Sequence, residues 1–178
     1  HYPLRRQRQM CIRDSCGALL GDLGAEVIRI ERLSGSEDRF IHPLKEEGGE
    51  GAMFMQMNRN KKGMTLNPTK EGSATIVEKL IKSADVVIAN LPPQTLKRMG
   101  IDYGTISKYN PGIILTTVSA FGAGGPYSER VGFDGVGQAM SGAAYLTGNE
   151  SEPVKAYSPY IDYLSLIHIS EPTRLRRI

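Results

Sequence analysis

A helix that runs directly into an apolar strand constrains the fold of this chain more than any other feature of its sequence. The helix is predicted over residues 71–84, where one face carries apolar residues at spacings of three and four: Ala74, Val77, Leu80, Ile81 and Ala84. The segment DVVIAN at 85–90 follows at once and is apolar on both faces, which is typical of a strand in a buried parallel sheet. The pair therefore predicts a helix packed on a parallel sheet.

The same alternation of strand and helix continues along the chain. Strands are predicted over residues 25–31, 63–66, 85–90 and 112–121. Helical sequence is predicted up to residue 23 and over residues 71–84, 93–99, 103–109 and 135–148. We therefore expect an α/β fold of Rossmann-like type, with a mostly parallel sheet and flanking helices.

The carboxyl ends of the strands are where ligands bind in sheets of this kind. Here those ends place Arg32, Asn90 and the glycine-rich loop at 122–125 at the expected ligand edge. No G-x-G-x-x-G follows a strand, and the chain has no P-loop motif. The motifs alone therefore predict the edge of the sheet at which a ligand binds, but they do not identify the ligand.

The two ends of the chain differ in character from its middle. The segments RRQRQMCIRD at 5–14 and LSLIHISEPTR at 164–174 back-translate into strings that resemble sequencing adapters read in frame. We therefore expect non-native tails at 1–15 and 164–178 around a native segment at 16–163, and few contacts between the tails and the core. Without the tails, the net charge of +3 becomes −2.

Composition then excludes several function classes. The middle segment is slightly acidic, so nothing in its charge supports nucleic-acid binding. It holds one histidine, His42, and one cysteine, Cys16, too few for a histidine-based triad or a metal cage, so we expect no metal site. No apolar run could span a bilayer and no signal peptide is present, which predicts a cytoplasmic protein that does not bind membranes.

Four stretches in order resemble one known family, the class III CoA-transferases, whose superfamily also contains α-methylacyl-CoA racemase. They are LLGDLGAEVIRIE, NRNKKGMTL, the segment from ADVVIANLPP to FGAGGPY, and GFDGVGQAMSGAAYLTG. The resemblance covers essentially all of residues 16–163. It implies the amino-terminal part of an incomplete large domain, with the strand before Cys16 and everything after Asp162 missing.

The resemblance also implies a binding site for CoA, which is a substrate here, so that no further cofactor is expected. The matching positions are Arg32, Leu66, Asn90, Leu91, Arg98 and Met99. Arginine suits the phosphates of CoA, since its fork can bond two phosphate oxygens at once. The segment LNPTKEG departs from the family pattern, so the family's lysine corresponds to either Thr69 or Lys70.

Asp162, in YIDY, matches the catalytic carboxylate of the family. An aspartate is already ionised at neutral pH and needs no partner base to attack a thioester. The implied reaction moves CoA from an acyl-CoA to a carboxylic acid through an aspartyl anhydride and an aspartyl-CoA thioester.

Other interpretations remain open beside the transferase. Racemases of the superfamily have G-H-D where this chain has GFD, and Phe133 cannot act as their histidine base. A non-catalytic nucleotide-binding α/β module is the remaining alternative for the parent protein. Full-length members form interlocked homodimers, so we expect the 178-residue chain by itself to be inactive.

Overall fold

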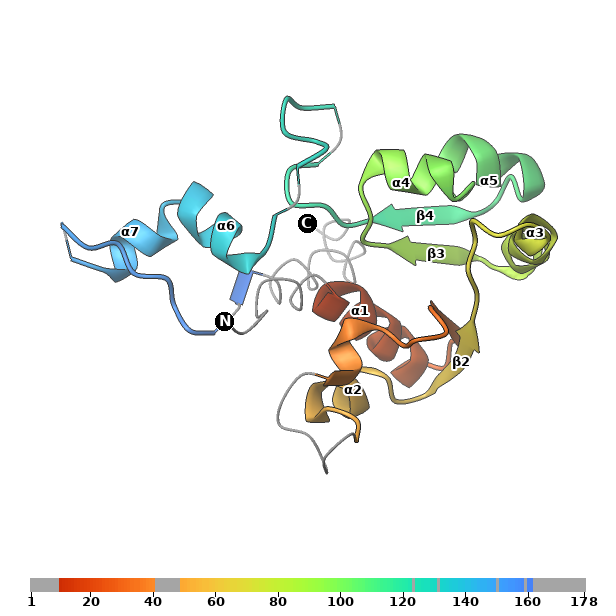
Figure 1. The fold of residues 1–178 in the computed structure, drawn as a ribbon, viewed down its shortest axis with the longest axis horizontal. Helices are drawn as coiled ribbons and strands as arrows, with labels where there is room; N and C mark the ends of the chain where they lie inside the picture. The colour runs from red at the N-terminus through yellow and green to blue at the C-terminus, as the bar shows by residue number, and fades with distance from the viewer. Residues whose placement is uncertain are drawn as a thin grey trace, which may run out of the picture.

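A computed structural model describes residues 10–40, 49–122, 124–130, 132–149, 151–158 and 160–161 (Figure 1). The strands are β1 (Val27–Glu31), β2 (Lys61–Thr65), β3 (Val86–Ala89) and β4 (Ile114–Thr117). The helices are α1 (Met10–Asp22), a 3-10 turn η1 (Glu37–Phe40), α2 (Ala52–Met57), α3 (Ser73–Ser83), α4 (Pro93–Arg98), α5 (Tyr103–Tyr109), α6 (Asp134–Met140) and α7 (Ala143–Thr147). The predicted α/β fold is confirmed.

The strands form two parallel pairs where the sequence predicted one sheet. β1 pairs with β2, from Val27 opposite Lys61 to Glu31 opposite Thr65. β3 pairs with β4, from Val86 opposite Ile114 to Ala89 opposite Thr117. In the described part of the chain no strand joins the pairs, and α1 contacts β1, β2 and β3. Helix packing, rather than a continuous ladder, therefore links the two pairs there.

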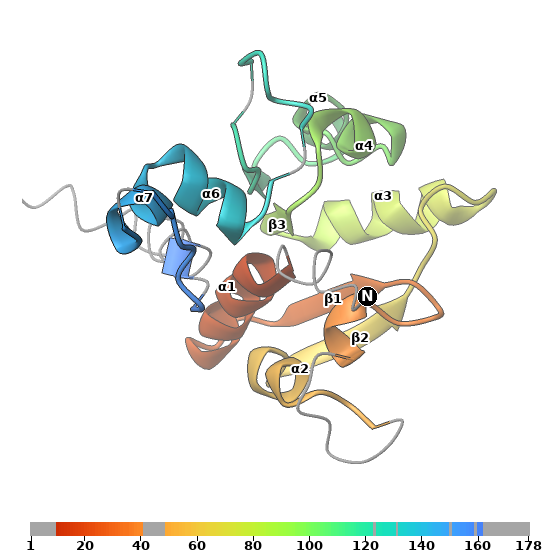
Figure 2. The ribbon, with the colours of Figure 1, turned by 60° about the vertical axis from the view of Figure 1, so that its left-hand side comes forward.

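The apolar core lies under α3, which runs beside the strands in Figure 2. Val77 and Ile81 of α3 pack with Ile106 and Ile113, and all four are buried. Each such side chain stabilises the fold by roughly 1.5–3 kcal/mol relative to an exposed one. The predicted periodicity of the helix is thus confirmed at its centre, while Ala74 at its start is exposed.

The β3–β4 pair buries only one of its two faces. Val87 and Leu115 pack against the core cluster, whereas Val86 and Ile114 are 40% and 58% exposed. The prediction of a strand buried on both faces is therefore wrong at these outer positions. The pleat alternates side chains between faces, and α3 and α5 supply the cluster that covers one of them.

Helix α1 ends as the sequence predicted. Gly24 has φ of +97°, a left-handed conformation that favours glycine, and Ala25 N–H bonds to Leu20 O at 3.0 Å. This closes the helix and turns the chain into β1.

The expected boundary between tail and native segment, at residues 15 and 16, falls inside α1. Asp14 and Ser15 are buried, with 3% and 5% of their surface exposed. The prediction of few core contacts for residues 1–15 is wrong for these two, because the Asp14 carboxylate neutralises buried cations of β1 and β2. The tail expected at 164–178 lies outside the described residues.

Helices α6 and α7 pack on each other at the opposite end of the molecule from α3 (Figure 1). The chain leaves α7 through the antiparallel bridge between Asn149 and Glu152. Val154 N–H then bonds to Ala144 O at 3.0 Å, which starts the return of the chain along these helices.

Candidate functional site

Arg32 and Leu66 lie at adjoining strand ends. Arg32 directly follows β1 and is exposed, and Leu66 directly follows β2. The backbone N–H of Leu66 bonds to Glu31 O at 2.9 Å, so the two positions meet at the carboxyl edge of this pair. The Leu66 side chain packs on the core cluster, so much of its apolar surface serves the fold.

The other predicted CoA contacts follow β3 and end α4. Asn90 and Leu91 come directly after β3 and are half-buried. Arg98 is the last residue of α4 and is exposed, and Met99 caps that helix, with its N–H bonded to Thr95 O. These residues belong to the β3–β4 pair, so the six positions fall into two groups. Their joint contact with one ligand stays a prediction.

A buried arginine of β1 anchors the turn that carries Arg32. Arg29 Nη1 lies 3.1 Å from Asp14 Oδ2, and Arg29 Nη2 lies 2.8 Å from Asp38 Oδ1. Buried charges of opposite sign in this geometry compensate one another's loss of water. Arg29 joins β1 to α1 and to the loop after Arg32. Arg29 is not among the residues predicted for the site, although Asp38 in GSED offered it a countercharge.

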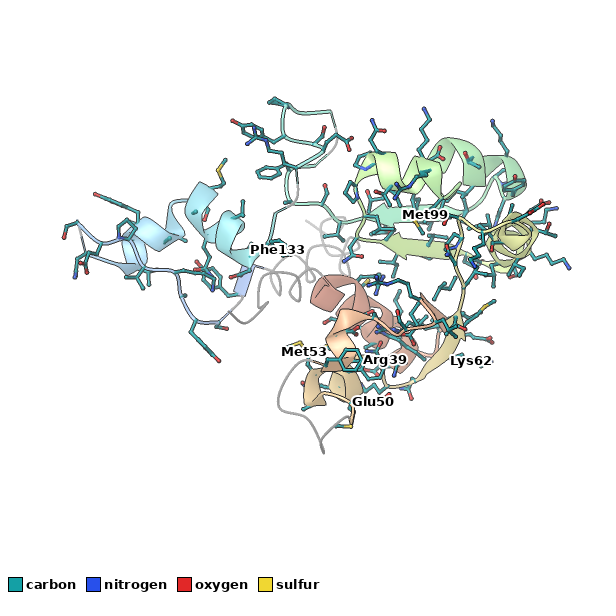
Figure 3. All side chains as sticks on the ribbon, viewed as in Figure 1. Arg39, Glu50, Met53, Lys62, Met99 and Phe133 are labelled. Carbon is teal, nitrogen blue, oxygen red and sulfur yellow. The ribbon has the colours of Figure 1, made fainter. Side chains whose placement is uncertain are left out.

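A second arginine closes the same loop. Arg39 pairs with Glu31 and with Glu50. Figure 3 shows Arg39 and Glu50 beside each other near α2. The guanidinium carbons of Arg29 and Arg39 lie 4.9 and 4.1 Å from the ring centre of Phe54, which adds cation–π attraction. Phe54 is the buried residue of α2.

Gly35 makes the tight turn after Arg32 possible. It has φ of +77°, and its N–H bonds to Arg32 O at 2.9 Å. The following N–H, that of Ser36, donates to Glu31 Oε2 at 3.2 Å. The two bonds close the turn around Arg32, whose side chain is exposed.

Ion pairs join six charged residues into one charge cluster: Asp14, Arg29, Glu31, Asp38, Arg39 and Lys61. Packing within this charge cluster shifts the pKa of several of its members. The hydrogen bond from Arg39 is the main cause that lowers the pKa of Glu31 to about 2. Burial lowers the pKa of Lys61 to about 8, although Asp14 opposes the shift. Burial raises the pKa of Asp14 against the attraction of Arg13, Arg29 and Lys61. The cluster thus favours ionised Glu31 most strongly.

Stability should therefore depend on the charge of Glu31. Its pKa falls from 4.5 to about 2 on folding, so its contribution is complete above about pH 4.5 and is lost as pH falls through 2. We expect Glu31→Gln to lower the free energy of unfolding by about 2–3 kcal/mol at pH 7, and by much less at pH 2. Urea titrations at the two pH values measure this difference. Glu78→Gln, which removes an exposed pair with Lys82, is the control and should cost under about 1 kcal/mol. An equal loss for Glu31→Gln at both pH values would contradict the prediction.

Two fully buried polar residues on α6 face the chain that returns from α7. Asp134 and Gln138 are each 0% exposed, and Gln138 Nε2 donates to Asp134 Oδ2 at 2.7 Å. Asp134 Oδ1 accepts the N–H of Ile161 at 3.1 Å. This pair is not among the residues predicted for the site, although the spacing of four in DGVGQ was a signal that both lie on one helix face.

The predicted nucleophile, Asp162, lies outside the described residues, as does Ala123 of the glycine-rich loop. Ile161, the residue before Asp162, is described and half-buried. Phe133 precedes α6 as its N-cap (Figure 3). Among the described residues, no group of three or more His, Cys, Asp or Glu is placed to hold a metal ion. No helix in those ranges is long and apolar enough to cross a membrane.

The family of this chain is established by a match to a known sequence profile. The sequence profile of CoA-transferase family III matches residues 9–170. The chain belongs to CoA-transferase family III. This match extends into both of the expected tails.

Curated members of family III resemble this chain over part of their length. It is 38% identical over 137 residues to the succinyl-CoA:glutarate CoA-transferase of Mus musculus, covering 76% of this chain and 31% of that protein. It is 38% identical over 144 residues to the succinyl-CoA–D-citramalate CoA-transferase of Chloroflexus aurantiacus, covering 78% of this chain and 34% of that protein. The chain therefore spans about a third of the length of these relatives.

Solved structures agree with the family III fold. A CAIB/BAIF family protein from Brucella suis superposes with a TM-score of 0.79 at 34% identity, covering 92% of this chain and 45% of that one. A hypothetical protein from Mycobacterium tuberculosis gives a TM-score of 0.80 at 30% identity, covering 91% and 45%.

Proposed function

We propose that the full-length protein containing this chain transfers CoA from an acyl-CoA thioester to a carboxylic acid. The match to CoA-transferase family III over residues 9–170 is the observation that carries the proposal. The named relatives act with succinyl-CoA, so succinyl-CoA and glutarate are the first donor and acceptor to assay.

Recognition of CoA is assigned to the residues that follow the strands. Arg32 and Arg98 are exposed cations suited to the phosphates of the nucleotide. Asn90 and Leu91 offer backbone groups to the amide-rich pantetheine arm, and Met99 and Leu66 offer apolar surface. The placement of four of these residues directly after parallel strands supports the assignment.

Asp162 acts as the nucleophile in this proposal. Its carboxylate attacks the thioester carbonyl, expels CoA thiolate and forms a mixed anhydride. The thiolate then attacks the aspartyl carbonyl, releases the donor acid and leaves an aspartyl-CoA thioester. The acceptor carboxylate attacks that thioester, expels CoA thiolate and forms a second mixed anhydride. The thiolate then attacks the acceptor's acyl carbonyl, which gives the new acyl-CoA and releases the free aspartate. Backbone N–H groups of Gly122 and Gly124, both at positive φ, are suited to stabilise the oxyanions.

Phe133 favours transfer over racemisation, since it stands where the related racemases have a histidine base. An assay in deuterated water separates the two reactions. Transfer gives the acceptor's CoA ester without deuterium at Cα, whereas racemisation exchanges the α-proton. Deuterium exchange without CoA transfer would overturn the proposal in favour of a racemase. CoA binding with neither reaction would favour a non-catalytic nucleotide-binding module.

Two further features of the protein belong to the same proposal. We propose that the full-length protein functions as a homodimer with interlocked chains. We also propose that it is located in the cytoplasm. Mass measurement of the full-length protein in solution tests the first, and the second needs a localisation experiment in cells.

Arg32→Ala should weaken binding more than chemistry. The arginine holds the remote nucleotide about equally in the ground and transition states, so its loss raises KM for acyl-CoA. We expect KM to rise roughly 10-fold, with kcat changed less than about 3-fold. Steady-state kinetics of the full-length protein measure both. Lys62→Ala, which removes a 71%-exposed lysine on β2, is the control. A fall in kcat with KM unchanged would contradict this role for Arg32.

A further inference from the structure

The side chains of Asp134 and Gln138 bind the backbone of the returning segment at three points. Asp134 Oδ1 accepts the N–H of Ile161 at 3.1 Å, and Gln138 Oε1 accepts the N–H of Ala156 at 2.8 Å. Gln138 Nε2 also reaches Ser158 O at 3.4 Å while donating to Asp134 at 2.7 Å. These contacts hold the backbone at Ala156, Ser158 and Ile161, and they do not depend on the side chains of those residues.

The buried carboxylate of Asp134 has hydrogen-bond donors and a cation beside it. A buried carboxylate is costly unless it is paired and hydrogen-bonded. Asp134 accepts from Gln138 and Ile161, and Lys155 Nζ lies 3.5 Å from its Oδ2. Lys155 is the charged group that faces Asp134 among the described residues.

Two glycines of α6 let the segment lie this close. A Cβ at Gly137 would meet Ile161 Cγ2 at 2.8 Å, and a Cβ at Gly135 would meet Lys155 Cδ at 3.3 Å. The helix face that presents Asp134 and Gln138 is thus shaped to accept the segment on both sides of the hydrogen bonds.

We propose that Asp134 and Gln138 are positioning residues that fix the backbone leading into Asp162, and so set the reach of its carboxylate. The inference rests on the proposed function, in which Asp162 is the nucleophile. Asp162 is the next residue after Ile161, whose N–H Asp134 holds. Misplacement of a reacting group by about 1 Å can cost on the order of 100-fold in rate. Binding of CoA through Arg32 and Arg98 does not depend on this segment.

Gln138→Glu tests the proposal through a pH profile. The substitution keeps an oxygen for Ala156 N–H but sets a second carboxylate against Asp134. Two carboxylates this close repel each other when both are ionised, as we expect at pH 8, and the contact is restored when they take up and share one proton at lower pH. At pH 8 we expect kcat of the full-length variant to be about 100-fold below that of the wild type. At pH 6 the difference from the wild type should shrink at least about 10-fold. KM for succinyl-CoA should be unchanged at both pH values. Met140→Gln, an exposed change on the same helix, should leave both constants unaltered.

A second pair of variants tests the same contact without changing a charge. Gly137→Ala should lower kcat about 10-fold by displacing Ile161, and adding Ile161→Ala should restore it by returning the space.

Hydrogen exchange on the 178-residue chain gives a readout independent of activity. In the Gln138→Ala variant the backbone amide of Ala156 should exchange faster than in the wild type, because it loses its acceptor. In the Asp134→Ala variant the backbone amide of Ile161 should exchange faster for the same reason. The amide of Val154, which bonds to Ala144 O, should stay protected in both.

A pH-independent loss or a normal kcat in Gln138→Glu, or unchanged exchange of both amides, would overturn the positioning role. If Gln138→Glu does not fold, the Gly137 variants and the exchange rates decide the question. Full activity of Asp162→Asn would instead overturn the proposed function, so the two failures are distinguishable.

Discussion

Asp162→Asn in the full-length protein is expected to lower CoA transfer by roughly 10³-fold or more. The amide keeps the shape of the side chain but removes the anionic oxygen that attacks the thioester in the proposed mechanism. Affinity for CoA should change little, since the contacts proposed for its phosphates are those of Arg32 and Arg98. Kinetics with succinyl-CoA and glutarate, together with CoA titration by calorimetry, measure the two effects separately.

Chemical trapping identifies the carboxylate directly. Incubation with acyl-CoA followed by hydroxylamine or borohydride marks an activated aspartate, and mass spectrometry of the tryptic peptide containing AYSPYIDY locates the label. Glu152→Gln, an exposed carboxylate ten residues upstream, is the control and should retain normal turnover. Near-normal turnover of Asp162→Asn, or a label on Asp134, would end the assignment.

Arg29→Met is expected to destabilise the chain by about 3–5 kcal/mol. Methionine fills much of the same volume, but it leaves the Asp14 and Asp38 carboxylates buried without the cation between them. The cation–π contact with Phe54 is lost as well. An effect of this size is a large fraction of the stability of an ordinary domain.

Denaturant unfolding at neutral pH measures this loss. Arg59→Met is the matched control, because Arg59 pairs with Asp22 at the exposed surface, where water screens the charges, and its loss should cost far less than that of Arg29. Arg29→Lys should lie between them, since lysine keeps the charge but lacks the fork that reaches both carboxylates. Equal losses for Arg29→Met and Arg59→Met would show that burial of the cluster contributes nothing.

The charge cluster also bears on function through the turn after β1. Arg29 and Arg39 hold Glu31 and Asp38 on either side of Arg32, and Gly35 closes the turn. In the proposed enzyme, this arrangement would present the Arg32 side chain to CoA from a rigid backbone. Loss of Arg29 should therefore raise KM for acyl-CoA as well as lower stability.

Much of the local structure could be predicted because its signals lie within a few residues of one another. Spacings of three and four predicted α3, Gly24 predicted the end of α1, and β-branched residues predicted β4. The family resemblance carried by four motifs agrees with the profile match and the solved structures. That resemblance named Asp162 and the CoA-contacting positions, whose roles remain predictions.

The sequence by itself determined the order and type of the four strands and of the helices other than α2 and η1. With them it determined the edge at which Arg32 and Asn90 follow their strands. Only the tertiary structure decided that Arg29 is buried between Asp14 and Asp38, and that the strands form two pairs. It alone placed Asp134 against the N–H of Ile161, 27 positions along the chain. Helical and strand periods repeat within a few residues and can be read locally. The partner of a buried charge depends on how distant segments pack, and no local pattern records that choice.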